Sequence, residues 1–399
     1  MKRRKLGTLE VSEIGFGCIQ CHAGIPEGQA SPGTRQDEAQ RDDQRPSGLA
    51  RRFGRRGTQR EVVMKAAVLR TPGGLDRIEV HDIPDPGQPG PGQIRIALHA
   101  SSLNSKDLLV ANGGLPTADR RILMSDGAGV VEAVGEGVAE FRPGDHVVSC
   151  FFPQWQDGLP SGPVCNLAST PGDGIDGFAA HFSVRAATAF THAPRGWSHA
   201  EAATITTAGV TAWRALVGDG QIKTGDTVLV LGTGGVSIAA LQIAKMMGAA
   251  VIATSSSDEK LERVRTLGAD HVINYRQVPD WGKRVRDLTG CGVDHVVEVG
   301  GPGTLAQSIE AVRVGGQISL VGMLTGLQGE WSTVALLAKQ ARLQGLMVGS
   351  RRQQQDYVAA LEQSRVRPVL DSSFSLDQLA DAFRYQASGA HFGKVAVEW

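Results

Sequence analysis

Hydrophobic and polar positions alternate with different periods in two parts of the chain. From residue 64 to about residue 150, short apolar runs are separated by turns rich in proline and glycine, which is typical of a small, barrel-like β domain. From about residue 210 to residue 349, strand-like runs alternate with helical ones, and this predicts a parallel, doubly wound sheet. The apolar runs of the first part are 65–69, 93–99, 128–134 and 145–149.

The second part begins with a strand, a glycine turn and a helix in succession. The apolar run 226–231 is followed by the sequence GTGGVS, and residues 236–245 continue as a helical pattern. Glycines let the backbone turn tightly and approach a pyrophosphate, while the helix N-terminus supplies free N–H groups and a partial positive charge. A strand at 251–254, a helix at 257–267 and a strand at 271–274 extend the pattern. The turn therefore predicts a dinucleotide site, the alternative being an ordinary strand-to-helix turn of an unrelated α/β protein. The residues expected to contact the cofactor there are Gly232, Thr233, Gly234, Gly235 and Val236.

The two ends of the chain depart from these patterns. Residues 23–61 are rich in Gly, Pro, Gln, Arg and Asp and have almost no apolar periodicity, so we expect residues 1–63 to form a disordered extension. Residues 1–18 resemble the opening strands of an aldo-keto reductase, but nothing of that barrel follows. We interpret them as a fusion remnant or a misplaced start, with Met64 as the natural beginning. The tail predicts two helices and a closing strand, at 356–363, 376–385 and 394–398.

Composition narrows the class of protein. The 399 residues suffice for two domains, and a formal net charge of zero predicts neither a nucleic-acid partner nor an acidic membrane surface. No apolar stretch reaches the roughly 20 residues that span a bilayer, and no secretory signal follows the basic N-terminus. The five cysteines are scattered, which favours reduced thiols in a cytoplasmic protein.

Several motifs together carry a family resemblance. From residue 64 onward the chain resembles the medium-chain dehydrogenase/reductase superfamily, and within it the zinc-free, quinone-oxidoreductase-like branch. This resemblance implies a GroES-like catalytic domain over 64–208 and 350–399, a Rossmann domain over 209–349, and an active site in the cleft between them. It also implies a small carbonyl substrate and a homodimer. The motifs that carry the resemblance are 64–69, 126–135, 141–147, 208–213, the glycine turn and 391–395.

The positions that hold catalytic zinc in related enzymes carry other residues here. By this resemblance Asn104 and Thr207 stand where cysteines bind zinc, and Met124-Ser125-Asp126 replaces a Gly-His-Glu motif. Zinc needs three Cys, His or carboxylate ligands and an open position, and Asp126 alone cannot supply them. We therefore expect no catalytic zinc.

The neighbouring zinc-dependent features are also replaced. The lobe that holds structural zinc in the family needs four cysteines, and residues 150–184 offer only Cys150 and Cys165. The hydroxyl and histidine of the zinc enzymes' proton relay correspond to Lys106 and Leu109. We therefore expect no structural zinc and no relay of that kind.

A missing Lewis acid restricts the chemistry that we expect. Zinc stabilises a developing alkoxide, so a simple aldehyde needs another electrophile without it. A conjugated substrate needs less help, because hydride at its β-carbon leaves an enolate or a hydroquinone anion that hydrogen bonds can stabilise. We expect hydride transfer to a quinone or an α,β-unsaturated carbonyl, with the proton supplied by water or a bound hydroxyl. A metal-free alcohol dehydrogenase and a non-catalytic NADPH sensor are the two alternatives.

The residues after the second predicted strand indicate which cofactor is bound. NAD-specific domains place an acidic residue there to bind the ribose 2′-hydroxyl, and this chain has Ser255 instead. Lys260 is a candidate cation for a 2′-phosphate, and Tyr275 matches a tyrosine that closes over that phosphate in the related reductases. We therefore expect NADP(H), with NAD(H) still possible because Asp258 and Glu259 lie nearby.

The remaining candidate residues belong to the catalytic end of the cofactor. Asn104 is the candidate contact for the nicotinamide ribose or a substrate oxygen, and Thr211 matches a threonine that packs on the nicotinamide in related enzymes. The aromatic run 151–155 either covers the substrate or belongs to the core or a subunit contact. The residues expected to line the nicotinamide pocket at the carboxyl edge of the sheet are Val299, Gly300 and Met323.

Overall fold

The computed structural model describes residues 3–6, 9–12 and 63–399, and the chain separates into two units, 1–58 and 59–399. In the first unit, β1 (Arg3–Leu6) pairs antiparallel with β2 (Leu9–Ser12). This hairpin and Val63, the first residue of the next strand, fall within the extension 1–63 that the sequence predicts to be disordered, and the rest of that extension lies outside the described residues. The other three sheets all lie in the second unit.

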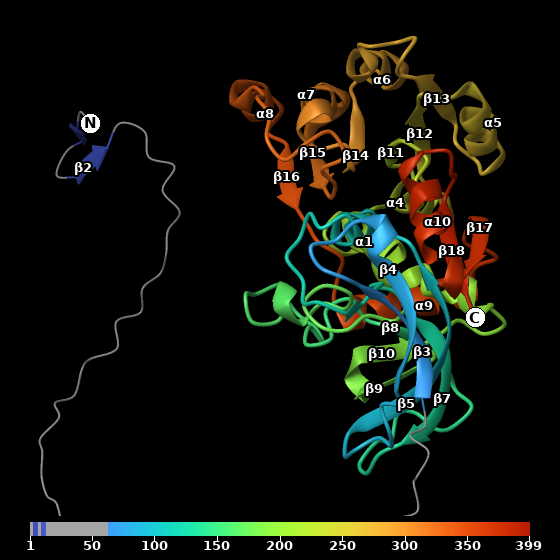
Figure 1. Ribbon diagram of the computed structural model, residues 1–399. Helices are drawn as coiled ribbons and strands as arrows, with labels where there is room; N and C mark the ends of the chain where they lie inside the picture. The colour runs from blue at the N-terminus through green and yellow to red at the C-terminus, as the bar shows by residue number, and fades with distance from the viewer. Residues whose placement is uncertain (1–2, 7–8, 13–62) are drawn as a thin grey trace, which may run out of the picture. The chain divides into compact units, whose positions relative to one another are not determined.

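The β domain is made from both ends of this unit (Figure 1). One sheet contains β4 (Ile78–Pro84), β3 (Val63–Leu69) and β6 (Arg121–Ile122), in that order. The larger sheet has the order β10-β8-β7-β5-β18-β17, and β9 also pairs with β5. The last strand of the chain is therefore an interior strand of the larger sheet. Its members are β5 (Gln93–Ser102), β7 (Ala128–Val134), β8 (His146–Ser149), β9 (Phe182–Ala186), β10 (Phe190–His192), β17 (Leu370–Ser375) and β18 (Lys394–Glu398).

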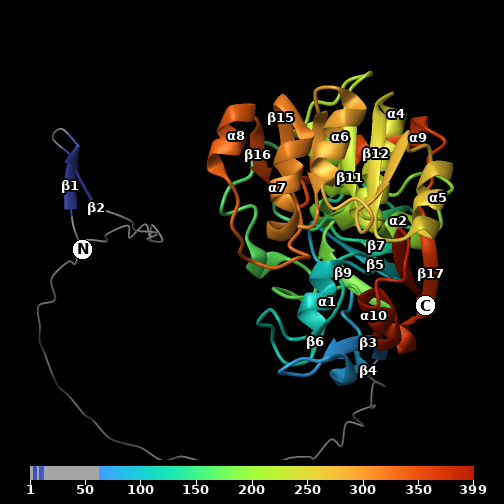
Figure 2. The ribbon, with the colours of Figure 1, turned by 90° about the horizontal axis from the view of Figure 1, so that it is seen from above.

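The second sheet is parallel throughout and has the strand order β13-β12-β11-β14-β15-β16. This order, with helices on both faces, is that of a dinucleotide-binding Rossmann fold, which confirms the predicted doubly wound sheet (Figure 2). The strands are β11 (Thr227–Leu231), β12 (Ala250–Ser255), β13 (His271–Asn274), β14 (Val293–Glu298), β15 (Val312–Leu320) and β16 (Arg342–Gly345). The helices are α4 (Gly235–Met246), α5 (Asp258–Thr266), α6 (Trp281–Thr289), α7 (Pro302–Ala311) and α8 (Thr333–Lys339).

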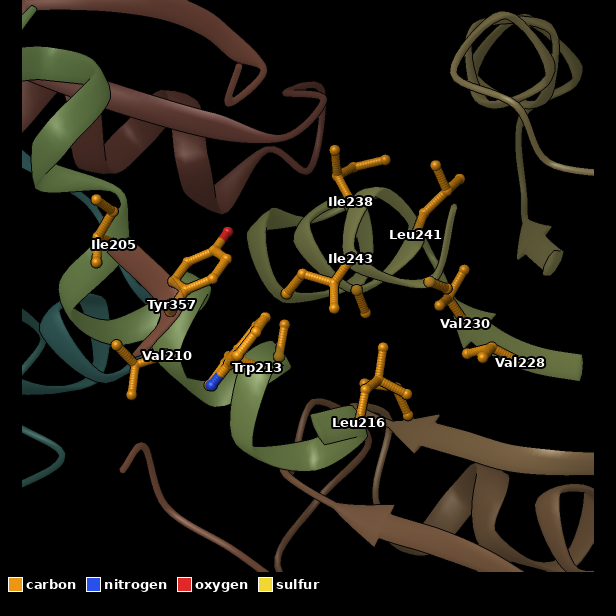
Figure 3. Close-up of a cluster of buried hydrophobic side chains, with 14 of the residues drawn as sticks. Ile205, Val210, Trp213, Leu216, Val228, Val230, Ile238, Leu241, Ile243 and Tyr357 are labelled. Carbon is orange, nitrogen blue, oxygen red and sulfur yellow. The ribbon is translucent and has the colours of Figure 1, made fainter. Parts of the chain in front are cut away.

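Alternate side chains of β11 enter two separate cores. Val228 and Val230 pack with α4 on one face of the sheet, as Figure 3 shows, whereas Leu229 and Leu231 pack with α6 and α7 on the other. Each such side chain contributes about 1.5–3 kcal/mol when fully buried. A strand that is apolar on both faces must be covered on both faces. β11 meets this condition, because it is an interior strand with helices packed on each side of the sheet.

A long helical segment connects the β domain to the Rossmann sheet. It runs through α2 (His199–Ala203), a π-helical turn at Ile205–Gly209, α3 (Val210–Trp213) and a second π-helical turn at Arg214–Gly218. A π-helical turn contains one residue more than an α-helical one, and such turns are frequent at functional sites. The other helices of this unit are α1 (Ser105–Ala111), α9 (Arg351–Gln363) and α10 (Leu379–Ala387).

The C-terminal segment joins the β domain to the glycine turn. The Gly393 N–H donates to the Thr233 carbonyl at 2.9 Å, and Gly393 forms an isolated parallel bridge with Gly234. The predicted closing strand, 394–398, is confirmed as β18. The aromatic run 151–155 contributes three fully buried side chains to the core around α3 and α4 rather than covering an open site. Among the described residues, no helix is both long and apolar enough to cross a bilayer.

Candidate active site

The glycine turn leaves the N-terminus of α4 open to a ligand. Gly232 has a φ of 72°, which side-chain-bearing residues rarely adopt, and its N–H donates to the Thr254 carbonyl. The N-cap of α4 is Gly234, and no side chain caps this helix, whereas serines cap α2, α5, α8 and α9. The first N–H groups of α4 are thus available to an anion such as a pyrophosphate, as the sequence predicts.

A buried carboxylate shapes the second turn at this edge of the sheet. Glu298, which ends β14 and has no exposed surface, accepts hydrogen bonds from the N–H groups of Gly300 and Gly301 at 2.8 and 2.9 Å. The hydroxyls of Thr304 and Ser308 bind the same carboxylate. These four donors fix the turn that contains Val299 and Gly300, two of the residues expected to line the nicotinamide pocket. The third, Met323, is 52% exposed.

The residues predicted to bind the 2′-phosphate gather at the end of β12. Ser255 is the last residue of that strand, and its carbonyl accepts the N–H of Tyr275, whose side chain is 41% exposed. The Asp258 carboxylate is occupied by the side-chain amides of Asn274 and Gln277. One of the two acidic residues that keep NAD(H) possible is therefore already hydrogen-bonded within the protein.

Lys260 lies on α5 and uses its ammonium group in an unexpected way. It donates to the carbonyl oxygens of Gly389 at 2.6 Å and His391 at 2.8 Å, so it links the Rossmann domain to the C-terminal segment. Burial lowers the pKa of Lys260. Two of its three N–H bonds are used, which leaves one for a phosphate. Its role toward the cofactor stays a prediction.

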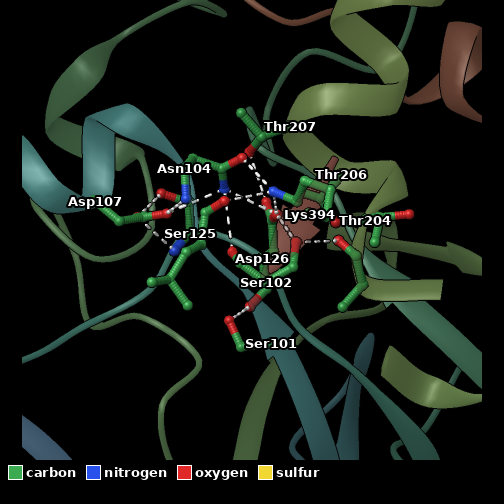
Figure 4. A network of polar contacts seen from close by, with 12 residues as sticks. Ser101, Ser102, Asn104, Asp107, Ser125, Asp126, Thr204, Thr206, Thr207 and Lys394 are labelled. Carbon is green, nitrogen blue, oxygen red and sulfur yellow. Dashed lines mark hydrogen bonds and ion pairs between the residues drawn. The ribbon is translucent and has the colours of Figure 1, made fainter. Parts of the chain in front are cut away.

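A second polar centre lies where α1 begins (Figure 4). Asn104 precedes α1, and Asp107 in the first turn accepts the Asn104 N–H at 3.1 Å and its side-chain amide at 3.0 Å. The other oxygen of Asp107 accepts the Ser125 N–H at 2.9 Å and its hydroxyl at 2.5 Å. Burial raises the pKa of Asp107, and the charge of Lys106 opposes that shift. Asp107 thus holds the start of α1 against the segment that carries Ser125.

The backbone before Asp126 is strained. Met124 has a φ of 78° and is buried, although a left-handed conformation costs a non-glycine residue about 1–2 kcal/mol. By the family resemblance, a glycine occupies this position in zinc-dependent relatives. The strained turn directs Ser125 and Asp126 into the polar centre.

The Asp126 carboxylate lies at the middle of this centre. One of its oxygens accepts the Ser102 hydroxyl at 2.6 Å and the Asn104 side-chain amide at 2.8 Å. The other accepts the Thr207 hydroxyl at 2.6 Å. Thr207 lies in the π-helical turn and is partly exposed, while Asp126 has no exposed surface. The residues that the resemblance matches to the zinc positions are therefore brought together in one network: Asn104, Ser125, Asp126 and Thr207.

The cation of this centre is Lys394, the first residue of β18. Its Nζ donates to the Leu103 carbonyl at 2.6 Å and to Asn104 Oδ1 at 2.7 Å, and lies 3.5 Å from Asp126 Oδ2. Burial lowers the pKa of Lys394, and the negative charge of Asp126 opposes that shift. A buried charge is tolerated only when it is paired and hydrogen-bonded, and both conditions are met.

The structure places the other catalytic candidates less centrally. Thr211 is buried in α3, one turn after Thr207. Lys106 binds Asp173, the Pro171 carbonyl and the Ser125 hydroxyl at the edge of the centre. Lys394 lies in the family motif 391–395, but no pattern in the sequence marks it as a residue of this centre.

Comparisons with known proteins agree with this architecture. The zinc-binding dehydrogenase family matches residues 235–364, and the alcohol dehydrogenase GroES-like domain matches residues 90–195. A zinc-type alcohol dehydrogenase-like protein of Schizosaccharomyces pombe is 42% identical over 339 residues, which cover 82% of this chain and 96% of that protein.

Solved structures give the same result. An NAD-dependent alcohol dehydrogenase is 35% identical with a TM-score of 0.78, covering 84% of this chain and all of the other. A crotonyl-CoA carboxylase/reductase in complex with NADP is 26% identical with a TM-score of 0.76, covering 84% of this chain and 94% of the other. The chain therefore belongs to the medium-chain dehydrogenase/reductase superfamily. It is an NAD(P)-dependent oxidoreductase of the alcohol dehydrogenase-like type that acts on a small molecule.

Proposed function

We propose that this oxidoreductase is zinc-independent, prefers NADP(H), and transfers hydride to a quinone or an α,β-unsaturated carbonyl compound. The observation that carries the proposal is that Lys394 forms an ion pair with Asp126, which replaces the Glu of the zinc enzymes' Gly-His-Glu motif.

The donor set of this centre suits a lysine better than zinc. Asn104, Ser125 and Thr207 offer an amide and two hydroxyls, which are poor zinc ligands. Asp126 is the one side chain of the four that zinc readily binds. That carboxylate already accepts three hydrogen bonds and faces an ammonium group. A zinc ion would have to displace Lys394 from a fully bonded position.

A conjugated acceptor suits a site of this kind. The Asn104 N–H groups and the Lys394 ammonium are directed at protein oxygens, so neither is free to stabilise an alkoxide. An acceptor that spreads the incoming charge into an enolate or hydroquinone anion needs fewer donors. The similarity to a crotonyl-CoA carboxylase/reductase supports this class, because the crotonyl group is an α,β-unsaturated acyl group.

The cofactor residues fit a phosphorylated dinucleotide. The open N-terminus of α4 would hold the pyrophosphate. Ser255, Lys260 and Tyr275 would hold the 2′-phosphate, since Ser255 stands where NAD-specific domains have an acidic residue. The nicotinamide supplies the hydride when it is bound. The protein contributes the fixed turns at Gly232 and Gly300, which position the two ends of the cofactor.

The hydrogen bond from Thr207 to Asp126 favours one alternative function. With its hydrogen directed at the carboxylate, the partly exposed Thr207 oxygen presents lone pairs outward. Such an oxygen can accept the hydroxyl hydrogen of an alcohol while its own proton moves to Asp126. A metal-free alcohol dehydrogenase is therefore the second candidate.

One assay separates these functions. NADPH oxidation is measured with an enone, a quinone and a saturated aldehyde in parallel, in the presence of a strong chelator. The proposal expects turnover of the enone or the quinone and none of the aldehyde. Turnover of the aldehyde alone would support the alcohol dehydrogenase, and binding of NADPH without any turnover would support a sensor. Loss of all turnover on chelation, reversed by zinc, would contradict the proposed metal independence.

We also propose that the protein is a homodimer, as the family resemblance implies. Val334 and Leu337 of α8 are 72% and 75% exposed, and β16 beside them is an edge strand. Exposed apolar residues next to an unpaired strand edge favour association with another chain. Light scattering after size exclusion should give about twice the 42.1 kDa chain mass.

A further inference from the structure

We infer that Lys394 is a positioning residue whose ammonium group takes the place of a metal ion, holding Asn104 and Asp126 in the arrangement that turnover requires. This inference rests on the proposed zinc-independent function. A metal ion at such a site would orient its ligands by binding them directly. Here a side chain of the protein supplies the charge, and the same side chain orients both residues.

The hydrogen bonds show how one ammonium group fixes two side chains. Asn104 Oδ1 accepts from Lys394 at 2.7 Å, so the Asn104 amide nitrogen must face Asp126 and Asp107, to which it donates at 2.8 and 3.0 Å. If the ammonium were lost, the amide could turn over and Asp126 would lose both a donor and its counter-charge. The Thr207 hydroxyl, bound to the other Asp126 oxygen, would then lose its fixed acceptor.

The path of the Lys394 side chain ties this centre to the glycine turn. A Cβ atom added at Gly235 would lie 2.5 Å from Lys394 Cδ, so the lysine stem passes directly over the first residue of α4. The preceding residue, Gly393, is hydrogen-bonded to Thr233 of the same turn. The turn that is expected to hold the cofactor therefore also places the cation.

The charge on Lys394 depends on its neighbours. The titratable groups that face it are Asp126 before β7, Asp107 on α1, and His391 in its own segment. Burial lowers the pKa of Lys394 below the usual lysine value of 10.5, and the two carboxylates oppose that shift. As the pH rises through this lowered pKa, the ammonium group loses its proton and Asp126 keeps an unpaired charge. Turnover should therefore fall on the alkaline side.

Replacing Asp126 by Asn tests this dependence without changing the size of the side chain. Since Asp126 stabilises the ammonium form, Asp126→Asn should move the alkaline limb of kcat/KM to lower pH, by about one unit. The 13Cε resonance of Lys394, followed by NMR in selectively labelled protein, should titrate at lower pH by the same amount. The matched control is Asp270→Asn, which removes the carboxylate 2.9 Å from Lys245 on the surface and should leave the limb in place.

A charge-neutral double variant tests whether the ammonium group is needed at all. Lys394→Met with Asp126→Asn leaves no buried unpaired charge, so it should fold, and its Lys394 resonance should be absent. We expect kcat to fall at least about tenfold, KM for NADPH to change less than about twofold, and the alkaline limb to disappear. Wild-type kcat, or an unchanged limb, in the folded double variant would overturn the inference. So would an Asp126→Asn protein in which the Lys394 resonance moves while the limb stays.

Those results leave the proposed function intact, because they concern only the role of Lys394. The proposed function fails on a different result, which is a wild-type enzyme that loses turnover with chelator and regains it with zinc. The two failures are therefore distinguishable in the same set of proteins.

Discussion

The glycine turn and the polar centre around Asp126 bind charge in opposite ways. The glycine turn offers backbone N–H groups at an uncapped helix end, and none of the residues 232–236 has a charged side chain. The polar centre is made of buried side chains whose charges and hydrogen bonds satisfy one another. Small changes in backbone shape can therefore alter anion binding at the glycine turn, whereas the polar centre is stable only when each of its partners is present.

The two regions should therefore respond differently to substitution. A change in the glycine turn should alter cofactor binding with little effect on folding, while a change in the polar centre should affect folding as much as turnover. Lys394 and Gly235 lie where the regions meet, so they test how far the distinction holds.

The largest effect is expected for Lys394→Met as a single substitution. It leaves Asp126 as a buried carboxylate without a counter-charge, and breaking a buried ion pair in this way costs about 3–5 kcal/mol. Urea unfolding measures the loss. As a control, Lys65→Met removes one partner of an exposed pair with Asp82, and its free energy of unfolding should change by less than about 0.5 kcal/mol. Equal small losses in both variants would show that the Lys394 charge is not paired in solution.

Two alanine substitutions in the glycine turn should separate its packing against Lys394 from its binding of the cofactor. Gly235→Ala places a methyl group against the Lys394 stem, and such overpacking destabilises a protein by about 1–3 kcal/mol. Gly234→Ala meets no atom within 4 Å and has a φ of −80°, so the free energy of unfolding should hardly change. Its methyl group should instead weaken NADPH binding, which fluorescence titration would measure. A loss of stability in Gly234→Ala but not in Gly235→Ala would contradict this assignment of packing to Gly235 and of cofactor binding to Gly234.

Lys260→Ala should distinguish the two cofactors. Losing a charged hydrogen bond to the 2′-phosphate should weaken NADPH binding by about tenfold or more, while NADH, which lacks that phosphate, should be affected far less. Because Lys260 also binds Gly389 and His391, a modest loss of thermal stability should accompany this change. Equal losses of affinity for both cofactors would limit Lys260 to this structural role.

The smallest effect concerns a histidine cluster in the β domain. His199 stacks on His99 and His146, and burial together with these two neighbours lowers its pKa to about 4. The unfolded chain therefore binds a proton at this residue between pH 6.5 and about 4 while the folded chain does not, so stability falls as the pH falls through that window. Partial exposure limits the loss to about 1–2 kcal/mol.

A substitution and its control check the origin of this pH dependence. His199→Gln should remove the contribution, so its free energy of unfolding should vary less between pH 7 and pH 4.5 than that of the wild type. The exposed His81 lies outside the cluster, and His81→Gln should keep the wild-type slope. A slope that persists in His199→Gln would assign the pH dependence to other groups.

The sequence predicts the glycine turn well because its signal is local. A strand, Gly232 to Gly235 and a helix follow one another, and each carries its own pattern, so the fold class and the cofactor-binding edge could be inferred from adjacent residues. The helix and strand periods also placed β13 and β18 at their observed bounds.

The polar centre could be predicted only in part. The family resemblance marked Asn104, Asp126 and Thr207 as occupants of the zinc positions, yet no local pattern shows that a lysine 290 residues from Asn104 supplies the positive charge. Likewise Lys260 stands where a phosphate ligand is expected, and nothing near it in sequence shows that two carbonyls of the C-terminal segment occupy it. Contacts of this kind arise from topology, which residue type and spacing do not encode.

The interior position of β18 has a consequence for how the protein is made. Because β5 is translated almost three hundred residues before β18, residues 100–102 at the end of β5 must wait for this partner, whereas β9 can pair with residues 93–97 earlier. The six parallel strands that end at residue 345 are complete well before that. We therefore expect the nascent chain to form its nucleotide-binding half first, and to complete the polar centre only after Lys394 has been made.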